Sequence, residues 1–269
     1  MSTEPQQITS LQNARVKQLV LLQQKSSERR RTCLFVVEGQ REIMHCHEAG
    51  YELDSIYYCP ALFTDKAGGQ QFLAQYSSRI SCFEVSPQVY EKIAYRGTTE
   101  GMLAVVRAKV LTLSSLHLKD RPLVMVLESV EKPGNLGAVL RSADAAQADA
   151  VIVCDPLTDL YNPNLIRSSI GAIFTVPCVA CSTDECIRFL KAHGIRILTA
   201  QLQDSHLYYD TDMRGGTAIV MGTESTGLTD TWRQAADAHI RIPMLGRLDS
   251  LNVSVSAAIL LFEAVRQRN

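Results

Sequence analysis

The sequence predicts an α/β protein built from two α/β domains. Three observations support this prediction. The chain has 269 residues, which exceeds the usual size of one domain. Helix-like and strand-like segments alternate along both halves. Residues 108–122, AKVLTLSSLHLKDRP, interrupt that alternation with Ser, Lys and Pro. We therefore predict a first domain over residues 1–107, a linker over 108–122 and a second domain over 123–269.

The first half contains four segments with the period of a helix and four with the character of a strand. The expected helices cover residues 13–24, 41–49, 70–76 and 87–94. The expected strands cover residues 34–37, 53–58, 80–83 and 102–107. Their order indicates a small, compact α/β unit.

The second half repeats the alternation with longer apolar strands. The expected strands cover residues 123–128, 150–154, 195–200, 217–221 and 239–242. The expected helices cover residues 136–147, 162–170, 183–193 and 252–267. Strands separated by helices predict a mainly parallel sheet with helices on both faces. Ligands of such sheets bind beyond the carboxyl ends of the strands.

Composition excludes several classes of protein. The 27 basic and 28 acidic residues nearly balance, so any surface that binds nucleic acid is local. No apolar run is long enough to cross a membrane, and the N-terminus has no apolar signal core. Eight scattered cysteines then predict a reducing cytoplasm. The pair Cys178-x-x-Cys181 has no second pair at ligand spacing, so we predict no metal site.

Polar loops follow three of the expected strands. The first contains Asn135 and leads into a helix with Arg141, the second runs from Gly222 to Gly227, and the third ends in Ser250-Leu-Asn252-Val-Ser254 before the last helix. Singly, each has a structural explanation as a turn or a helix cap. Together, at three strand ends, they predict one site for a polar ligand. The second loop is not a nucleotide-binding P-loop, because Leu and Thr follow its last Gly where Lys and Ser or Thr are required.

These loops carry a family resemblance. The patterns N-x-G-x-x-x-R at 135–141, G-x-E-x-x-G-L at 222–228, and I-P-M with S-L-N-V-S between 242 and 254 occur in that order. The chain thereby resembles the SpoU/TrmH family of RNA ribose 2'-O-methyltransferases, which is part of the SPOUT class. The resemblance implies a C-terminal SPOUT α/β domain with a deep trefoil knot, a homodimer, and S-adenosylmethionine as the cofactor.

The resemblance also implies the site residues. Cofactor contacts fall on the three loops and one further strand end: Thr199, Ala200, Gly222, Ile242, Met244, Leu251 and Asn252. The group implied for catalysis is Arg141, Asn135, Glu224, Ser250 and Asn252. The family role of Arg141 includes taking the 2'-hydroxyl proton, but a guanidinium normally stays protonated, so bidentate phosphate contact is the alternative.

Residues 1–107 resemble the ribosomal-protein-like RNA-binding domain that accompanies these enzymes, through Ser10, Asn13, Lys17 and the run FVVEG at 35–39. The segment 13–31 carries six basic residues and one acidic residue. A phosphate-contacting patch is expected there. The predicted RNA contacts are Lys17, Arg29, Arg30, Arg31 and, in the second half, Arg167.

The predicted function is 2'-O-methylation of a ribose in RNA by a cytoplasmic enzyme. Ribosomal RNA is the preferred substrate, because an RNA-binding domain precedes the catalytic one, and transfer RNA is the alternative. A second class of function stays open: a non-catalytic RNA-binding or ribosome-assembly protein with the same fold.

Overall fold

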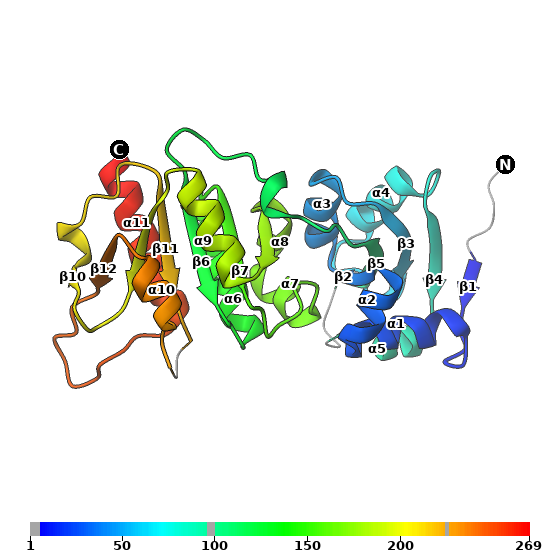
Figure 1. The fold of residues 1–269 in the computed structure, drawn as a ribbon. Coiled ribbons are helices and arrows are strands. Elements are labelled where there is room, and N and C mark those ends of the chain that lie inside the picture. Colours follow the sequence, from blue (N-terminus) through cyan, green and yellow to red (C-terminus); the bar gives the residue numbers. More distant parts are fainter. Residues whose placement is uncertain (1–5, 96–99, 224–225) are drawn as a thin grey trace. The chain divides into compact units, whose positions relative to one another are not determined.

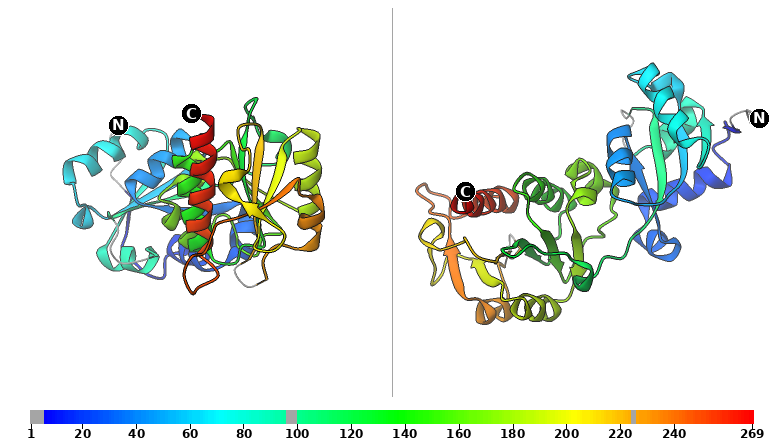
Figure 2. Two further views of the ribbon diagram at one scale, coloured as in Figure 1. Left: turned by 90° about the vertical axis from the view of Figure 1, so that its left-hand side faces the viewer. Right: turned by 90° about the horizontal axis from the view of Figure 1, so that it is seen from above.

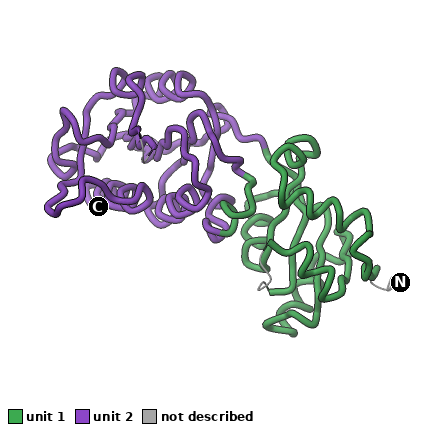
Figure 3. The backbone as a smooth tube through the Cα atoms, turned by 90° about the horizontal axis from the view of Figure 1, so that it is seen from below, with its two compact units in different colours: residues 1–109, 161–167 green, residues 110–160, 168–269 purple. Residues whose placement is uncertain are grey.

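The computed structural model describes residues 6–95, 100–223 and 226–269. The chain forms two compact units (Figures 1 and 3). Unit 1 contains residues 1–109 and 161–167, and unit 2 contains residues 110–160 and 168–269. The predicted α/β class is confirmed, because each unit combines one sheet with flanking helices.

Unit 1 has a mixed five-stranded sheet with the order β1-β4-β3-β5-β2. Its strands are β1 (Gln6–Ile8), β2 (Leu34–Glu38), β3 (Leu53–Tyr58), β4 (Ser81–Val85) and β5 (Met102–Arg107). Its helices are α1 (Ala14–Gln24), α2 (Ser26–Thr32), α3 (Gln40–Glu48), α4 (Lys66–Tyr76) and α5 (Pro87–Ile93), and a 3₁₀ turn spans Pro60–Leu62. The strands β3 and β2 run antiparallel to β5, and the other pairs are parallel. All eight elements predicted for this half are present within a few residues of their expected bounds.

One core of unit 1 lies between its sheet and the pair α1 and α5. Val16, Leu19 and Leu22 recur at helical spacing on α1 and are almost fully buried. Asn13 caps this helix, because its side-chain oxygen accepts a hydrogen bond from the backbone N–H of Arg15 at 2.9 Å. The apolar periodicity of the sequence was therefore sufficient to predict α1.

A segment from the second half of the chain belongs to unit 1. The Tyr161 ring stacks on Phe35 with 4.2 Å between the ring centroids. The Tyr161 hydroxyl accepts a hydrogen bond from the Lys109 N–H and donates one to the Lys109 carbonyl. Helix α7 (Pro163–Ser169) follows directly. The predicted second domain, 123–269, is thus interrupted at 161–167, because these aromatic and polar contacts group that segment with unit 1.

Unit 2 has a seven-stranded sheet, parallel throughout, with the order β10-β12-β9-β11-β6-β7-β8. Its strands are β6 (Leu123–Glu128), β7 (Ala150–Cys154), β8 (Cys178–Cys181), β9 (Arg196–Ala200), β10 (His206–Leu207), β11 (Thr217–Met221) and β12 (Ala238–Arg241). Its helices are α6 (Pro133–Ala145), α8 (Ala172–Thr175), α9 (Thr183–Ala192), α10 (Asp230–Ala235) and α11 (Val253–Arg268), with 3₁₀ turns at Leu113–Ser115 and Tyr208–Asp210. The short elements β8, β10, α8 and α10 were not predicted.

Helices cover both faces of this sheet, as predicted. Helices α6 and α11 pack side by side on one face, and α9 and α10 lie on the other (Figure 2). Trp232 of α10 and Leu190 of α9 are fully buried in the core of that second face. Leu113, Leu116 and Leu118, from the predicted linker, pack against the same core. Residues 110–122 are therefore part of unit 2.

Helix α11 is fixed at its C-terminal end by Arg268. The guanidinium donates hydrogen bonds to four backbone carbonyls, those of Met213, Gly215, Arg121 and Pro122, at 2.6–3.2 Å. These carbonyls precede β11 and β6. Because a parallel sheet aligns all its strands, the opposite end of α11 lies toward the carboxyl ends of β6 and β11.

Replacing Arg268 tests this anchor. We expect Arg268→Ala to lower the free energy of unfolding by about 2 kcal/mol, since hydrogen bonds of a charged donor contribute roughly 1.5–3 kcal/mol. Urea denaturation measures the change. Arg214→Ala is the matched control, because Arg214 is exposed and pairs only with the exposed Asp212 among the described residues. Equal stability of the two variants would contradict the anchoring role.

Candidate functional site

A cavity of about 540 Å³ lies at the carboxyl ends of three strands of unit 2. Its walls come from the residues that follow β9, β11 and β12 and from the loop that leads into α11. Six of the seven residues predicted to bind the cofactor line it: Ala200, Gly222, Ile242, Met244, Leu251 and Asn252. The cavity therefore occupies the place where a parallel sheet binds its ligands.

Thr199, the seventh predicted residue, lies beneath the cavity. Its side chain is fully buried, and its hydroxyl is 2.6 Å from Nδ1 of His239 on β12. Thr199 does not line the cavity. It is the penultimate residue of β9, and the alternation of side chains along a strand turns it away from the face that Ala200 presents. The contact between Thr199 and His239 joins the neighbouring strands β9 and β12 beneath the cavity.

Gly222 permits the tight turn that shapes the cavity. A Cβ atom at this position would collide with the backbone of Gly227 and with the N–H of Leu228. Thr223 and Gly227 pair through two backbone hydrogen bonds of 3.2 and 3.1 Å, which close the loop. The predicted residue Glu224 falls within this loop and lies outside the described residues.

Asn252 joins two of the predicted motifs. Its side-chain oxygen caps α11 by accepting a hydrogen bond from the Ser254 N–H at 3.0 Å. Its amide nitrogen donates to Oδ1 of Asn135 at 3.4 Å. Asn135 lines a second cavity, of about 130 Å³, which shares Gly222, Thr223 and Val253 with the larger one. The Asn252 side chain therefore caps α11 and also belongs to the candidate site.

The structure separates the other predicted catalytic residues. Ser250 lines the larger cavity, and its hydroxyl donates to Oδ1 of Asp249 at 3.3 Å. Arg141 is exposed on α6 and lines neither cavity. It lies six residues beyond Asn135, about 9 Å further along the helix. In the described part of the chain, no group accepts a hydrogen bond from its guanidinium.

Polar side chains that were not predicted also line the larger cavity. They are Gln201, Gln203, Thr223, Arg233, Arg241, Asp249 and Ser256. The Arg233 guanidinium Nη1 lies 3.4 Å from Asp230, and its Nε is buried without a partner in the described residues. Helix α10 is only six residues long, so no periodicity indicated that its Arg turns toward the site. The two glutamines could have been predicted as site residues, because the sequence Gln-Leu-Gln directly follows the end of β9.

The predicted RNA-contacting residues divide into two groups. Lys17, Arg30 and Arg31 are exposed on α1 and α2, and Arg31 pairs with Glu28 at 2.6 Å. Arg29 is buried, and its Nη1 donates to the carbonyls of Leu22 and Gln23 at the end of α1. We therefore remove Arg29 from the predicted RNA contacts, because its guanidinium closes a helix end. Exposed Arg167 lines a separate cavity of about 250 Å³ within unit 1, with Glu38, Arg41 and Glu42.

The pair Cys178-x-x-Cys181 does not form a site. Burial raises the pKa of the Cys178 thiol to about 12, so it stays protonated at neutral pH. Cys181 instead lies beside Cys154 and Cys186. All eight cysteines are free. Spacing along the sequence could not show that Cys154, Cys181 and Cys186 lie together, because they come from different elements.

Comparison with known proteins decides the family. Residues 122–262 match the SpoU rRNA Methylase family. That stretch covers more than half of the chain and contains all three motifs. The chain belongs to the SpoU rRNA methylase family. Residues 13–104 match the MRM3-like substrate binding domain, which corresponds to unit 1 without its segment 161–167.

Relatives of this SpoU family member cover nearly its whole length. The 23S rRNA (guanosine(2553)-2'-O)-methyltransferase RlmP of Bacillus subtilis (strain 168) is 28% identical over 256 residues, which are 95% of this chain and 98% of the relative. A crystal structure of an RNA 2'-O ribose methyltransferase is 39% identical, with a TM-score of 0.85, and the match covers 97% of this chain and 99% of the other. An AdoMet-bound rRNA methyltransferase from Sinorhizobium meliloti is 28% identical, with a TM-score of 0.89 and 97% coverage of both chains.

Within the described ranges, no helix combines the length and the hydropathy that a membrane span requires.

Gly222 offers a direct test of the larger cavity. We expect Gly222→Ala to weaken S-adenosylmethionine binding at least about tenfold, which corresponds to about 1.4 kcal/mol, because the added Cβ displaces the loop backbone. Isothermal titration calorimetry measures the affinity. Gly215→Ala is the control, since a Cβ there meets nothing within 4 Å. Unchanged affinity in Gly222→Ala would place the cofactor elsewhere.

Proposed function

We propose that this protein transfers a methyl group from S-adenosylmethionine to a ribose 2'-oxygen of ribosomal RNA. The observation that carries the proposal is the cavity beyond β9, β11 and β12, formed by the family's motif loops. Relatives whose names state this reaction, on 23S rRNA, match nearly the whole chain. One activity therefore explains why the chain has both units.

The lining of the larger cavity suits this cofactor. Ile242, Met244 and Leu251 offer apolar surface, and the loop at Gly222 lets backbone approach the ligand closely. Arg233 supplies a cation for a carboxylate group. When bound, S-adenosylmethionine supplies an electrophilic methyl on a sulfonium. The protein's task is to hold the ribose hydroxyl in line with that methyl and to exclude water.

Three side chains orient the RNA in this proposal. Asn135 and Asn252, joined to one another, present amide groups where the two cavities meet. Arg141 holds an RNA phosphate in bidentate contact and positions the ribose, because a guanidinium is a poor proton acceptor. Unit 1 adds phosphate contacts through Lys17, Arg30 and Arg31.

A homodimer explains the position of Arg141. Val255, Ile259 and Phe262 lie on one side of α11, and Val255 and Phe262 are each 47% exposed. Because α11 packs beside α6, a partner covering this stripe would also lie near Arg141. We propose that Arg141 of one protomer serves the cavity of its partner.

The proposal also includes a trefoil knot in unit 2 and a cytoplasmic location. Two observations support the knot. One is the family match, and the other is the course of the chain after β12, the second strand from the edge. The chain then returns to the centre of the sheet as α11. Support for the location is the set of eight free cysteines.

Methyl transfer to purified RNA tests the reaction. We expect tritiated methyl from S-adenosylmethionine to appear on a ribose 2'-oxygen of unmodified 23S rRNA and not on transfer RNA. We expect Arg141→Ala to lose at least about a hundredfold in rate, or about 2.7 kcal/mol, while keeping cofactor affinity. Arg188→Ala, which removes an exposed cation on the opposite face of the sheet, is the control. Label on transfer RNA alone would favour the alternative substrate, and cofactor binding without label on any RNA would favour a non-catalytic protein.

Mixing two impaired variants tests the shared site, at an S-adenosylmethionine concentration too low to saturate Gly222→Ala. A heterodimer of Arg141→Ala and Gly222→Ala protomers contains one intact site only if Arg141 serves the partner's cavity. At equilibrium half of the dimers in the mixture are heterodimers, and each of these has one damaged and one complete site. We therefore expect the mixture to recover up to about a quarter of the wild-type rate per site. No recovery, with heterodimers verified by tagged co-purification, would mean that Arg141 acts within its own protomer.

Phe262 tests the oligomeric state. We expect Phe262→Asp to produce monomers at micromolar concentration in analytical ultracentrifugation, since a buried unpaired carboxylate in an apolar interface is unfavourable by several kcal/mol. Leu157→Asp is matched in chemistry and changes a leucine that is 66% exposed and lies outside α6 and α11. A dimer that survives the change at Phe262 would exclude this stripe from the interface.

A further inference from the structure

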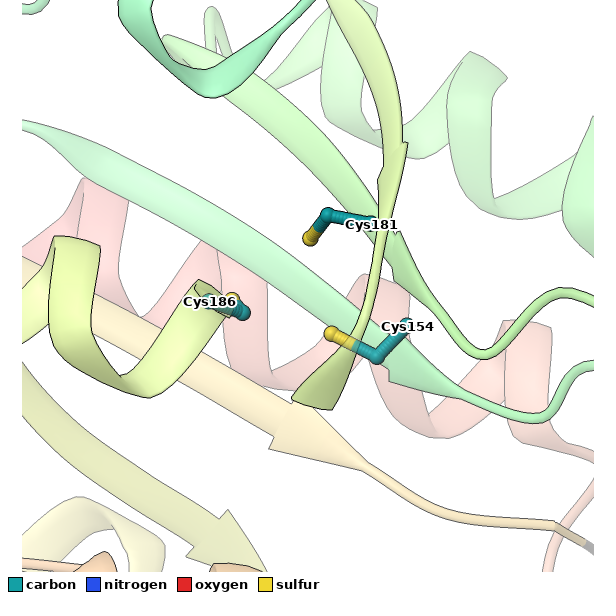
Figure 4. A group of neighbouring side chains, drawn as sticks. All are labelled: Cys154, Cys181 and Cys186. Atoms are coloured by element: carbon teal, nitrogen blue, oxygen red, sulfur yellow. The ribbon is translucent and has the colours of Figure 1, made fainter. Parts of the chain in front are cut away.

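Three thiols meet in unit 2 outside the proposed active site. Cys154 is the last residue of β7, Cys181 is the last residue of β8, and Cys186 lies in the first turns of α9. Their sulfur atoms all lie within 4.8 Å of one another. Figure 4 shows the three side chains converging from the two strand ends and the helix. We call this group the thiol cluster.

The fold dictates this convergence. Cys154 and Cys181 are register partners in the parallel pair of β7 and β8, so their side chains leave the sheet on the same face. A tight turn through Ser182 then starts α9, which a capping box of Ser182 and Glu185 fixes. The first turn of α9 brings Cys186 over the two strand ends.

Neighbouring groups hold the frame of the cluster rigidly. Thr183 at the start of α9 donates to the Asp155 carboxylate through its hydroxyl at 2.7 Å and through its backbone N–H at 3.2 Å. The backbone N–H of Asp155 donates to the Cys181 carbonyl at 2.9 Å. The loop after β7, the end of β8 and the beginning of α9 are thus tied together without using any sulfur.

We propose that the thiol cluster is a binding site for a thiophilic divalent cation of the zinc class. Cysteine sulfur is the ligand that such ions prefer. A zinc–sulfur bond of about 2.3 Å sets two sulfurs of a tetrahedral site about 3.8 Å apart, so sulfurs within 4.8 Å need to close by at most about 1 Å. Small side-chain rotations suffice for that movement.

Charge selects a divalent ion over a monovalent one. Binding displaces the thiol protons to solvent, so three thiolates face the ion. Asp155 and Glu185 add negative charge at the ends of the same elements. A divalent ion neutralises more of this charge than copper(I). The N-terminal end of α9 carries the positive end of the helix dipole, which favours the thiolate form of the cysteines.

The site would have an open position. Among the residues that the structure describes, no fourth Cys, His, Asp or Glu atom joins the three sulfurs within the same distance. Cys154 and Cys186 are fully buried, whereas Cys181 is partly exposed. A water molecule or an external thiol therefore completes the coordination on the side of Cys181. A tightly bound ion would clamp the edge strand β8 to α9.

Cadmium binding tests the site without an activity assay. The full-length protein, reduced and then freed of reductant and metal, is titrated with Cd²⁺ while the sulfur-to-cadmium charge-transfer absorption is followed in the ultraviolet. We expect a band that saturates at one Cd²⁺ per chain. Zn²⁺ bound beforehand should lower the apparent affinity for Cd²⁺, because both ions compete for the same sulfurs. Zn²⁺ alone should raise the melting temperature of the metal-free protein.

Cysteine variants locate the binding. Cys181→Ser replaces the partly exposed member and should remove most of the band, with far-ultraviolet circular dichroism confirming the fold. Cys186→Ala is the second variant in case the first does not fold. Cys33→Ser, which changes the exposed cysteine in unit 1, should leave the band and its stoichiometry unchanged. No saturable band, or a band lost in Cys33→Ser but kept in Cys181→Ser, would overturn the proposal. A disulfide within the cluster that persists after reduction, detected by mass spectrometry, would also overturn it.

Discussion

The architecture of unit 2 depends on the return of α11 from the edge of the sheet to its centre. Strand β12 lies next to the edge, yet the helix that follows packs beside α6 against β6 and β11. Arg268 fixes the far end of this helix with hydrogen bonds to carbonyls that precede β6 and β11. The loop 242–252 must therefore cross the carboxyl ends of the intervening strands. That crossing forms one wall of the larger cavity.

The same constraint unites motifs that are far apart in the sequence. The first turns of α6 and α11 meet because the two helices pack side by side, and the contact between Asn135 and Asn252 spans 117 positions. Gly222 closes the third loop between them. A capped helix start, a tight turn and a strand end each have local structural reasons. Their function arises because the fold places all three around one space.

Most of the regular elements of this structure were predictable from the sequence. The strands Leu123–Glu128 and Thr217–Met221 consist mainly of apolar residues, and all of their residues are buried, so their apolar runs locate them in the sequence. The loops at the strand ends were identifiable because polar and glycine residues interrupt those runs. Six of the predicted cofactor contacts line the cavity for that reason.

Other features required the three-dimensional structure. Arg29 looks like its neighbours Arg30 and Arg31 in a basic run, and only the position of the end of α1 shows that it is buried. The segment at Tyr161 joins unit 1 through stacking on Phe35, a contact across more than 120 positions. The thiol cluster is formed by strand register, which spacing along the chain does not contain. Local patterns determine elements, whereas tertiary packing determines which side chains meet.

A crystal structure of the protein with S-adenosylmethionine tests the assignment of the larger cavity most directly. We expect the cofactor in the cavity bounded by Ala200, Gly222 and the loop from Ile242 to Asn252, with its methyl group directed toward Asn135 and Asn252. A cofactor bound elsewhere in unit 2, or one whose methyl faces away from these amides, would contradict the assignment of this cavity as the active site.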